Sequence, residues 1–212
     1  MHALSEGLVF VDDELLVLDK PAGLLAVPGR GEDKQDCLSA RAQALWPDAL
    51  VVHRLDMATS GLFLMGRGVH MQRVLGRAFA ERQVRKGYEA IVAGVPGPVG
   101  AQGLIELPLA ADWPNRPRQQ VDREHGRPSV TRWQVQAVQE GTARLALEPL
   151  TGRTHQLRVH LQAIGHPILG DALYAPPGIA ARAPRLLLHA CALELAHPAS
   201  GEPLHFESAV PF

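Results

Sequence analysis

The stretch from residue 51 to residue 64 constrains this chain most. A β-branched pair at 51–52 and an apolar run at 62–64 are typical of two buried strands, and a polar segment separates them. If that segment is extended, Arg54 and Asp56 leave the same face of the chain. Residues 59–61, Thr-Ser-Gly, then supply turn chemistry. The pattern predicts charged side chains presented at a bend between two strands, where a rigid scaffold commonly carries function.

An Arg-x-Asp pair taken alone is most often an exposed ion pair that contributes only ~0–1 kcal/mol. The whole segment His53–Gly61, His-Arg-Leu-Asp-x-x-Thr-Ser-Gly, is more specific. It resembles the signature of the pseudouridine synthases of large-subunit ribosomal RNA. Two further motifs in the expected order extend the resemblance over essentially the whole chain: Lys-Pro-x-Gly at 20–23, and Gly-Arg-Thr-His-Gln-Leu-Arg at 152–158. The Leu-His-Ala at 188–190 is also similar to the C-terminal end of this family.

Length and composition exclude several classes of protein. A chain of 212 residues suits one large domain or two small lobes. No apolar run approaches the ~20 residues of a membrane span, and residues 1–6 lack the organisation of a secretion signal. Cys37 and Cys191 stand alone, which indicates reduced thiols rather than a disulfide framework. We therefore expect a cytoplasmic protein without a membrane partner.

Positive charge is clustered although the formal net charge is −1. The range 67–86 holds six basic residues against the single acid Glu81, and a second basic run covers residues 116–132. Arg outnumbers Lys 18 to 3, and the guanidinium group suits forked phosphate contacts. A solvated helix face would show the same clusters, so charge alone leaves RNA contact and simple solvation equally open.

Periodicity predicts the local elements. The helix at 69–80 has a clean apolar stripe with Arg73 and Arg77 outside it. The Gly/Pro-rich range 94–103 is interpreted as a loop between lobes or sheet halves. The remaining predictions are strands at 8–11, 15–18, 86–92, 104–109, 130–138, 143–147, 186–190 and 192–195, a helix at 37–45 capped by Asp36, and a helix that ends at Ile164.

The resemblance implies more than periodicity can. It implies an α+β pseudouridine synthase fold, with a bent, mostly antiparallel mixed β-sheet flanked by helices and loops and a cleft between two halves. Residues 1–212 would form a single catalytic domain without a separate N-terminal RNA-binding module.

The resemblance also implies the catalytic residues. Asp56 is the catalytic carboxylate, Tyr88 of Lys-x-Tyr lies against the target base, and Arg153 pairs with Asp56 and favours its charged form. Arg54 enters the space that a flipped nucleotide vacates. The substrate-binding residues expected in this way are Arg54, His53, Thr59, Lys20, Trp113 and Arg116. On general grounds a Tyr on a strand or a Trp is more often a core residue, and Lys-Pro-x-Gly is more often a structural turn.

The chemistry needs little besides these side chains. Pseudouridine formation detaches uracil from C1′, rotates it and reattaches it through C5, with no redox change, so no cofactor and no metal are implied. The base must leave the helix, and an ionised carboxylate must lie near the sugar or the base. Attack at C1′, attack at C6 and a route through a glycal remain open at this point.

The loop at 112–119 is similar to that of the smallest member of the family, which modifies both ribosomal and transfer RNA. It implies uridines in stem-loops of 23S rRNA and in the tRNA anticodon loop as substrates, with no obligate protein partner and a monomeric state. A single rRNA or tRNA site is the alternative within the family. A base-releasing hydrolase lacks a second carboxylate, because Glu89 points away from Tyr88. A metal enzyme is disfavoured, since His155 and His160 are five residues apart, and a non-catalytic RNA-binding protein remains the rival of another class.

Overall fold

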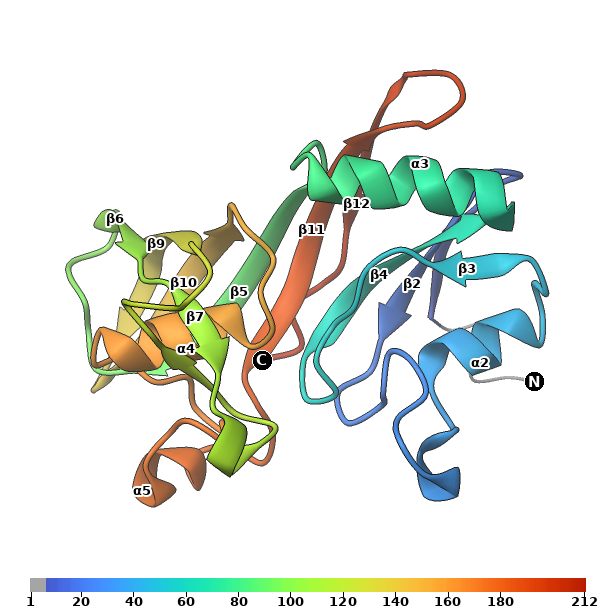
Figure 1. Cartoon of the computed structure of the whole chain (residues 1–212). Helices are drawn as coiled ribbons and strands as arrows, with labels where there is room; N and C mark the ends of the chain where they lie inside the picture. The colour runs from blue at the N-terminus through green and yellow to red at the C-terminus, as the bar shows by residue number, and fades with distance from the viewer. Residues whose placement is uncertain (1–6) are drawn as a thin grey trace. The chain divides into compact units, whose positions relative to one another are not determined.

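The computed structural model describes residues 7–212 and divides the chain into two compact units (Figure 1). Unit 1 contains the chain up to Lys86 and the range Ala190–Pro211, and unit 2 contains Gly87–His189 and Phe212. The chain passes from one unit to the other within β5 (Arg85–Ala93) and returns within β11 (Leu188–Ala196). The expectation that the N-terminus carries no secretion signal falls on residues 1–6, outside the described residues. Among residues 7–212, no helix is long and apolar enough to cross a membrane.

Unit 1 is built on antiparallel strands. β1 (Leu8–Val11) and β2 (Leu15–Lys20) form the predicted hairpin, and β4 (Ser60–Arg67) pairs with β2. The order continues from β4 to β11, with β3 (Ala49–Val51) on β4 and β12 (Pro203–Glu207) on β11.

At the closing strands, one sequence prediction was wrong and one strand was not predicted. The strands expected at 186–190 and 192–195 are one strand, β11, because Cys191 continues the ladder and its carbonyl accepts the N–H of Ser208 at 2.9 Å. β12 was missed, since a five-residue segment that begins with Pro and contains two apolar residues has a weak pattern of its own. Pairing with β11 supplies the hydrogen bonds that define it.

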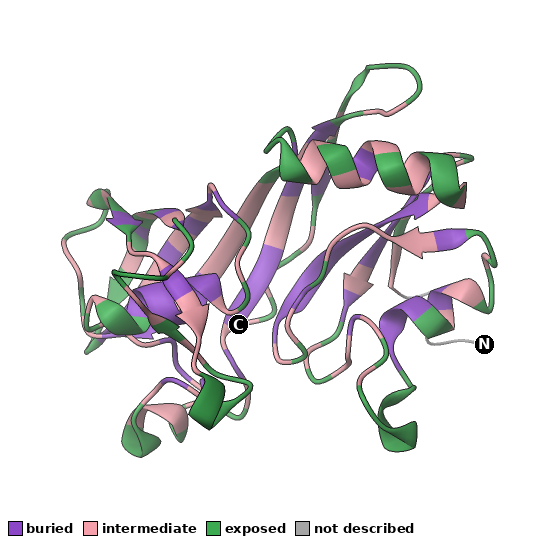
Figure 2. Cartoon of the chain, viewed as in Figure 1, coloured by how far each residue is buried: buried purple, intermediate pink, exposed green. Residues whose placement is uncertain are grey.

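The helices of unit 1 follow the sequence closely. A short 3-10 helix, η1 (Glu32–Lys34), precedes α2 (Leu38–Gln43), and α3 (Gly68–Ala80) confirms the predicted amphipathic helix, with Arg73 and Arg77 exposed (Figure 2). Asp36 does not cap α2 as predicted. Its carboxylate pairs with Arg41 at 2.6 Å, and the Sγ of Cys37 accepts the N–H of Ala40 at the cap position.

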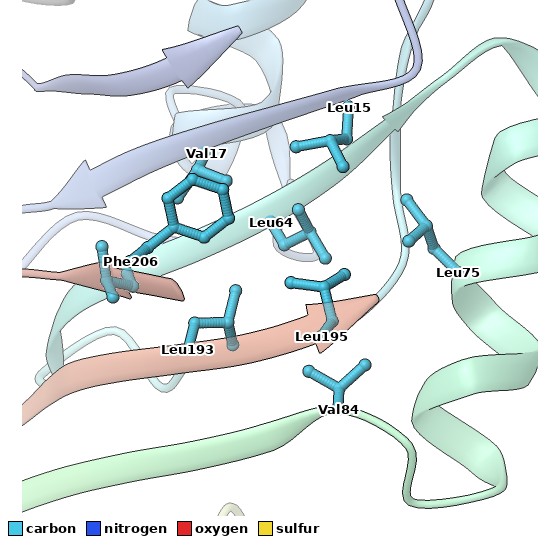
Figure 3. Packing of buried hydrophobic residues seen from close by; sticks show 9 residues of the cluster. Leu15, Val17, Leu64, Leu75, Val84, Leu193, Leu195 and Phe206 are labelled. Carbon is cyan, nitrogen blue, oxygen red and sulfur yellow. The ribbon is translucent and has the colours of Figure 1, made fainter. Parts of the chain in front are cut away.

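The core of unit 1 is an apolar cluster between α3 and the strands (Figure 3). Leu75 of α3 lies over Leu64 of β4, and Leu193 and Leu195 of β11 complete the layer. Removing one such buried leucine side chain typically costs about 2–5 kcal/mol. Because this packing fixes β4, it also fixes the position at which the preceding polar turn meets the strand.

Unit 2 holds a four-stranded antiparallel arrangement in the order β5-β10-β9-β6. The Gly/Pro-rich range 94–103, predicted to be a loop between lobes or sheet halves, contains the loop that joins β5 to β6 inside this unit, so it does not connect the two units. Helix α4 packs on β8, β9 and β10. The bounds not yet given are β6 (Gln102–Glu106), β7 (Leu109–Ala111), η2 (Trp113–Asn115), β8 (Gln119–Val121), β9 (Val130–Gln139), β10 (Thr142–Pro149), α4 (Gln156–Ala163) and α5 (Pro177–Ala180).

Candidate functional site

The polar segment between β3 and β4 is an irregular turn rather than an extended strand. Leu55 is buried, Asp56 is half-buried and Arg54 is exposed. The turn closes where the N–H of Thr59 donates to the carbonyl of Asp56 at 3.1 Å, and Thr59 itself is buried. The segment therefore holds its carboxylate at the edge of the unit 1 core and leaves the cation in solvent.

His53 anchors the start of this turn. Its ring stacks on Phe79 of α3, with 4.5 Å between centroids, and lies 5.0 Å from the ring of Phe63 of β4. Its Nε2 accepts the N–H of Leu64 at 2.9 Å. Burial, with a smaller contribution from the charge of Lys86, lowers the pKa of His53 to about 3. His53 is therefore a neutral structural residue, and these contacts do not fit the predicted direct binding of substrate.

Lys20 supports the same turn from the buried side. Its side chain is 0% exposed, and its Nζ donates to the carbonyls of Pro21, Leu24 and Met57 at 2.8–3.1 Å. The carbonyl of Met57 also accepts the N–H of Gly23 at 2.8 Å. Lys20 has no exposed surface with which to contact RNA, so the prediction of direct substrate binding does not fit. The residue joins the Lys-Pro-x-Gly loop to the Asp56 turn instead.

Gly61 closes the segment. It has a φ of 110°, and a Cβ at this position would lie 2.2 Å from the carbonyl oxygen of Ala190 in β11. Any larger residue would force β4 away from β11 immediately after the turn. The glycine of the first motif therefore serves close strand packing.

In unit 2, Arg153 lies on a turn held by one buried amide. The Oε1 of Gln156 accepts the N–H of Arg153 at 3.1 Å and the hydroxyl of Thr151 at 2.7 Å. Its Nε2 donates to the carbonyl of Val130 and to the hydroxyl oxygen of Thr131, both at 3.0 Å. The two bonds donated by Nε2 tie the turn to β9, and the two accepted by Oε1 lie within the turn itself. Within residues 7–212, the buried Nε of Arg153 has no hydrogen-bond acceptor.

The same network continues to a buried histidine of α4. The Nδ1 of His160 lies 2.9 Å from the hydroxyl of Thr131, and its Nε2 lies 2.9 Å from the carbonyl of Leu107. Burial lowers the pKa of His160, against the opposing effect of the Leu107 hydrogen bond. Since the carbonyl can only accept, the neutral ring carries its hydrogen on Nε2. This histidine is structural and holds no metal-ligand role.

Tyr88 lies on β5, opposite Leu147 of β10, and is half-buried. Ala90 and Val92, which alternate with it along the strand and share its face, are buried. Asp56 belongs to unit 1, whereas Tyr88 and Arg153 belong to unit 2. Their convergence in one pocket stays a prediction and is taken up in the proposed function.

The loop between β7 and β8 presents Trp113 and Arg116. The Trp113 side chain is 66% exposed, and the guanidinium carbon of Arg116 lies 3.3 Å from the centre of its ring. The loop is anchored where the N–H of Gln119 donates to the hydroxyl of Tyr174 at 2.8 Å. That hydroxyl also lies 2.6 Å from the Nδ1 of His155, within hydrogen-bond distance. Trp113 is therefore an exposed aromatic residue, and the guanidinium of Arg116 already stacks on its ring.

Sequence reasoning missed two residues that organise unit 2. Gln156 was quoted within the third motif without a role, and Tyr174 was not singled out. An uncharged amide side chain within a motif of basic residues could have indicated a residue that forms several hydrogen bonds. Tyr174 gave no such signal, because its partners Gln119 and His155 are far from it in sequence.

One cluster of side chains has the composition of a metal site. The ligand atoms of Asp12, Glu14 and His197 lie within 4.8 Å of one another. The Nε2 of His197 lies 2.9 Å from Asp12, and its Nδ1 accepts the N–H groups of Ala199 and Ser200. Burial would raise the pKa of Asp12, but hydrogen bonds from two backbone N–H groups and from His197 outweigh it and lower the pKa. These contacts make the cluster a tie between the β1–β2 turn and the β11–β12 hairpin.

Comparisons with known proteins agree with the motifs. The family model for RNA pseudouridylate synthase matches residues 14–163. The dual-specificity RNA pseudouridine synthase RluA of Escherichia coli K12 is 49% identical over 206 residues, covering 97% of this chain and 93% of that protein. The corresponding protein of Vibrio cholerae serotype O1 is 49% identical over 192 residues, covering 91% and 78%.

Solved structures show the same fold. Human RNA pseudouridylate synthase domain containing 4 has a TM-score of 0.78 at 29% identity and covers 99% of this chain and 90% of its own. Human RNA pseudouridylate synthase domain containing 1 has a TM-score of 0.77 at 27% identity, with coverages of 97% and 84%. The sequence motifs, the α+β architecture and these matches lead to one conclusion: the chain belongs to the RNA pseudouridylate synthase family.

Proposed function

We propose that this protein isomerises uridines to pseudouridines in stem-loops of 23S rRNA and in the anticodon loop of tRNA. The observation that carries the proposal is the Asp56 turn, a half-buried carboxylate held by Lys20 and His53 in a chain of this family. The dual substrate class rests on the loop at 112–119 and on its relatives, which are named dual-specificity RNA pseudouridine synthases. The protein acts in the cytoplasm, as a monomer without an obligate protein partner.

The proposed mechanism uses side chains alone. The target uridine flips out of the RNA, Arg54 takes its place, and Tyr88 stacks on the extracted base. The carboxylate of Asp56 meets the positive character that develops as uracil leaves C1′, or attacks the sugar or base directly. Arg153 pairs with Asp56 and favours its charged form. Uracil rotates and rejoins the sugar through C5. The proton on C5 is released to solvent while N1, which has lost its bond to C1′, takes up a proton, so the product is an isomer of the substrate.

Direct binding by Trp113 and Arg116 is the second part of the proposal. The exposed ring offers one face to a base, while Arg116 on the ring supplies a cation for the phosphate backbone. Stacking of a base on an aromatic side chain is worth about 1–3 kcal/mol. These two residues would hold the loop of the RNA, whereas Lys20 and His53 would act only through the turn that they support.

A base-releasing hydrolase is disfavoured by the surroundings of Glu89. Hydrolysis of a glycosidic bond normally uses a second carboxylate. Glu89 lies on β5 next to Tyr88, but its Oε2 pairs with Arg144 at 2.8 Å. A carboxylate committed to an ion pair on the opposite face of the strand is poorly placed to activate water for a base stacked on Tyr88.

The test is to incubate the protein with stem-loop RNA that carries tritium at C5 of uracil. Release of tritium is expected for the wild type, and Asp56→Asn should reduce it by a factor on the order of 10⁴ or more while RNA binding persists. Asp13→Asn is the matched control, because Asp13 is an exposed carboxylate of unit 1, and it should release tritium normally.

The outcomes separate the alternatives. Full release by Asp56→Asn refutes the assignment of the catalytic residue. Loss of the base without tritium release indicates a hydrolase, and binding alone indicates a non-catalytic RNA-binding protein. Separate rRNA and tRNA transcripts test the dual specificity, since modification of only one would leave a single-site enzyme.

A further inference from the structure

Unit 2 contains a cleft of about 270 Å³ beside the β7–β8 hairpin. Its floor is β7, and its walls come from the loop at 122–127 and from the turn that precedes α4. Arg127, Arg153 and His125 bring positive or titratable groups to it, and none of the lining residues is acidic. The lining residues are Leu109, Ala110, Ala111, Gln119, His125, Arg127, Arg153 and Thr154.

The wall that carries Arg127 is rigid. Arg127 and Leu109 exchange two backbone hydrogen bonds, at 2.8 and 3.0 Å, which fasten the loop to β7. The carboxylate of Asp122 accepts the N–H groups of Glu124 and His125. At Gly126 a Cβ would lie 2.2 Å from the carbonyl oxygen of Asp122, so the loop is packed as tightly as a backbone allows. The backbone of Arg127 therefore has a fixed position.

The two arginines of the cleft lack partners within the described part of the chain. The exposed guanidinium of Arg127 has no ion pair there, and the buried Nε of Arg153 has no acceptor. A buried donor without a partner destabilises the fold, so a ligand that accepts this hydrogen bond removes that cost. His125 is different, because Asp122 and Glu124 lie 3.9 and 4.0 Å from its Nδ1 and balance any charge that it acquires.

We propose that this cleft binds one backbone phosphate of the RNA substrate, outside the target uridine, through Arg127 and the Nε–H of Arg153. Guanidinium groups suit phosphate because their N–H donors form a planar fork. The Nε–H of Arg153 is separate from its two terminal nitrogens, which remain available for Asp56. The proposal rests on the proposed function, since it names a further contact with the same RNA.

The size and position of the cleft fit the binding of a segment of a polymer better than that of a whole small molecule. Pockets that enclose a whole small ligand usually measure ~300–1,000 Å³, and this open cleft is smaller. Ala111 and Gln119, which line it, are the paired residues on either side of the loop that bears Trp113. A strand of RNA with one phosphate in the cleft would continue toward that exposed ring. Phosphate contacts of this kind set the register of the RNA rather than read its sequence.

The test compares Arg127→Gln with Arg123→Gln. Both residues are exposed arginines of the same loop, and Arg123 does not line the cleft. For a synthetic stem-loop substrate, Arg127→Gln should weaken binding by about 10–100-fold and lower the slope of log K against log salt by about 0.7. Arg123→Gln should leave both values unchanged. The turnover rate at saturating RNA and the urea midpoint should remain those of the wild type in both variants.

The decisive measurement uses RNAs in which one phosphate at a time is replaced by a neutral methylphosphonate. One linkage should weaken binding to the wild type and to Arg123→Gln, and the same linkage should have a smaller effect on Arg127→Gln, in which only the contact with Arg153 remains. Equal losses in both variants, or no linkage whose effect depends on Arg127, overturn the inference. Tritium release by the wild type is scored separately, so an active enzyme without this linkage dependence refutes the phosphate site alone.

Discussion

The two motif turns of this protein are held by different chemistry. In unit 1 the Asp56 turn is supported by a fully buried ammonium, because Lys20 donates to three carbonyls. In unit 2 the Arg153 turn is supported by a neutral amide, because Gln156 makes four hydrogen bonds. A charged donor forms stronger hydrogen bonds than a neutral one, so its removal costs the buried acceptors more. A charged residue of a motif can therefore support the backbone from inside the core, as Lys20 does.

The largest expected effect is that of Lys20→Met. The substitution keeps a long apolar stem but removes the ammonium from three carbonyls, of which that of Met57 keeps the N–H of Gly23, so we expect a loss of about 3–5 kcal/mol in the free energy of unfolding, measured by urea denaturation. Lys34→Met is the matched control, because Lys34 is exposed, and it should change stability by less than ~0.5 kcal/mol. Equal effects of the two substitutions would show that Lys20 does not support the turn.

Gln156→Leu should have a somewhat smaller effect. It removes both ends of the amide and leaves the N–H of Arg153 and the hydroxyl hydrogen of Thr151 without their acceptor, at an expected cost of about 2–4 kcal/mol in urea denaturation. Gln162→Leu tests the same change at an exposed position of α4 and should be close to neutral. If Gln156→Leu proved more destabilising than Lys20→Met, the order of the two scaffolds would be reversed.

The smallest effect concerns the pH dependence of unit 1. The pKa of His53 lies below its ordinary value, so below pH ~6.5 the unfolded chain binds a proton that the folded chain refuses until pH ~3. Stability is therefore full above pH ~6.5 and falls by about 1.4 kcal/mol per pH unit below it, or about 2 kcal/mol by pH 5.

His53→Gln keeps a hydrogen-bond acceptor but cannot titrate, so its stability should fall less steeply with acid than that of the wild type. Urea denaturation at several pH values from 7 to 5 measures both slopes. His160 contributes in the same direction, so the slope should shrink rather than vanish. Parallel curves for the two proteins would contradict the role assigned to His53.

Much of the fold could be predicted because its signals are local. The β1–β2 hairpin and helix α3 each carry their pattern within a few residues, and the structure confirms them. The sequence predictions failed where tertiary contacts determine the local structure. Cys37 replaced Asp36 at the cap of α2, and β12 exists through its pairing with β11. The sequence of a short segment with few apolar residues does not predict a strand whose hydrogen bonds come from pairing with another strand.

The sequence by itself determined the family, the order of the three motifs and the identity of the candidate carboxylate, because these depend on residue types at short spacings. Only the tertiary structure decided that Lys20 and His53 are internal supports, that Gln156 is a hub and that Arg127 shares a cleft with Arg153. Lys20 meets Met57 across 37 residues, and Gln156 meets Val130 across 26. The contact of Lys20 follows from the register of β2, since a shift of one residue would turn its side chain to the other face of the sheet, whereas that of Gln156 follows from the packing of α4 on β9.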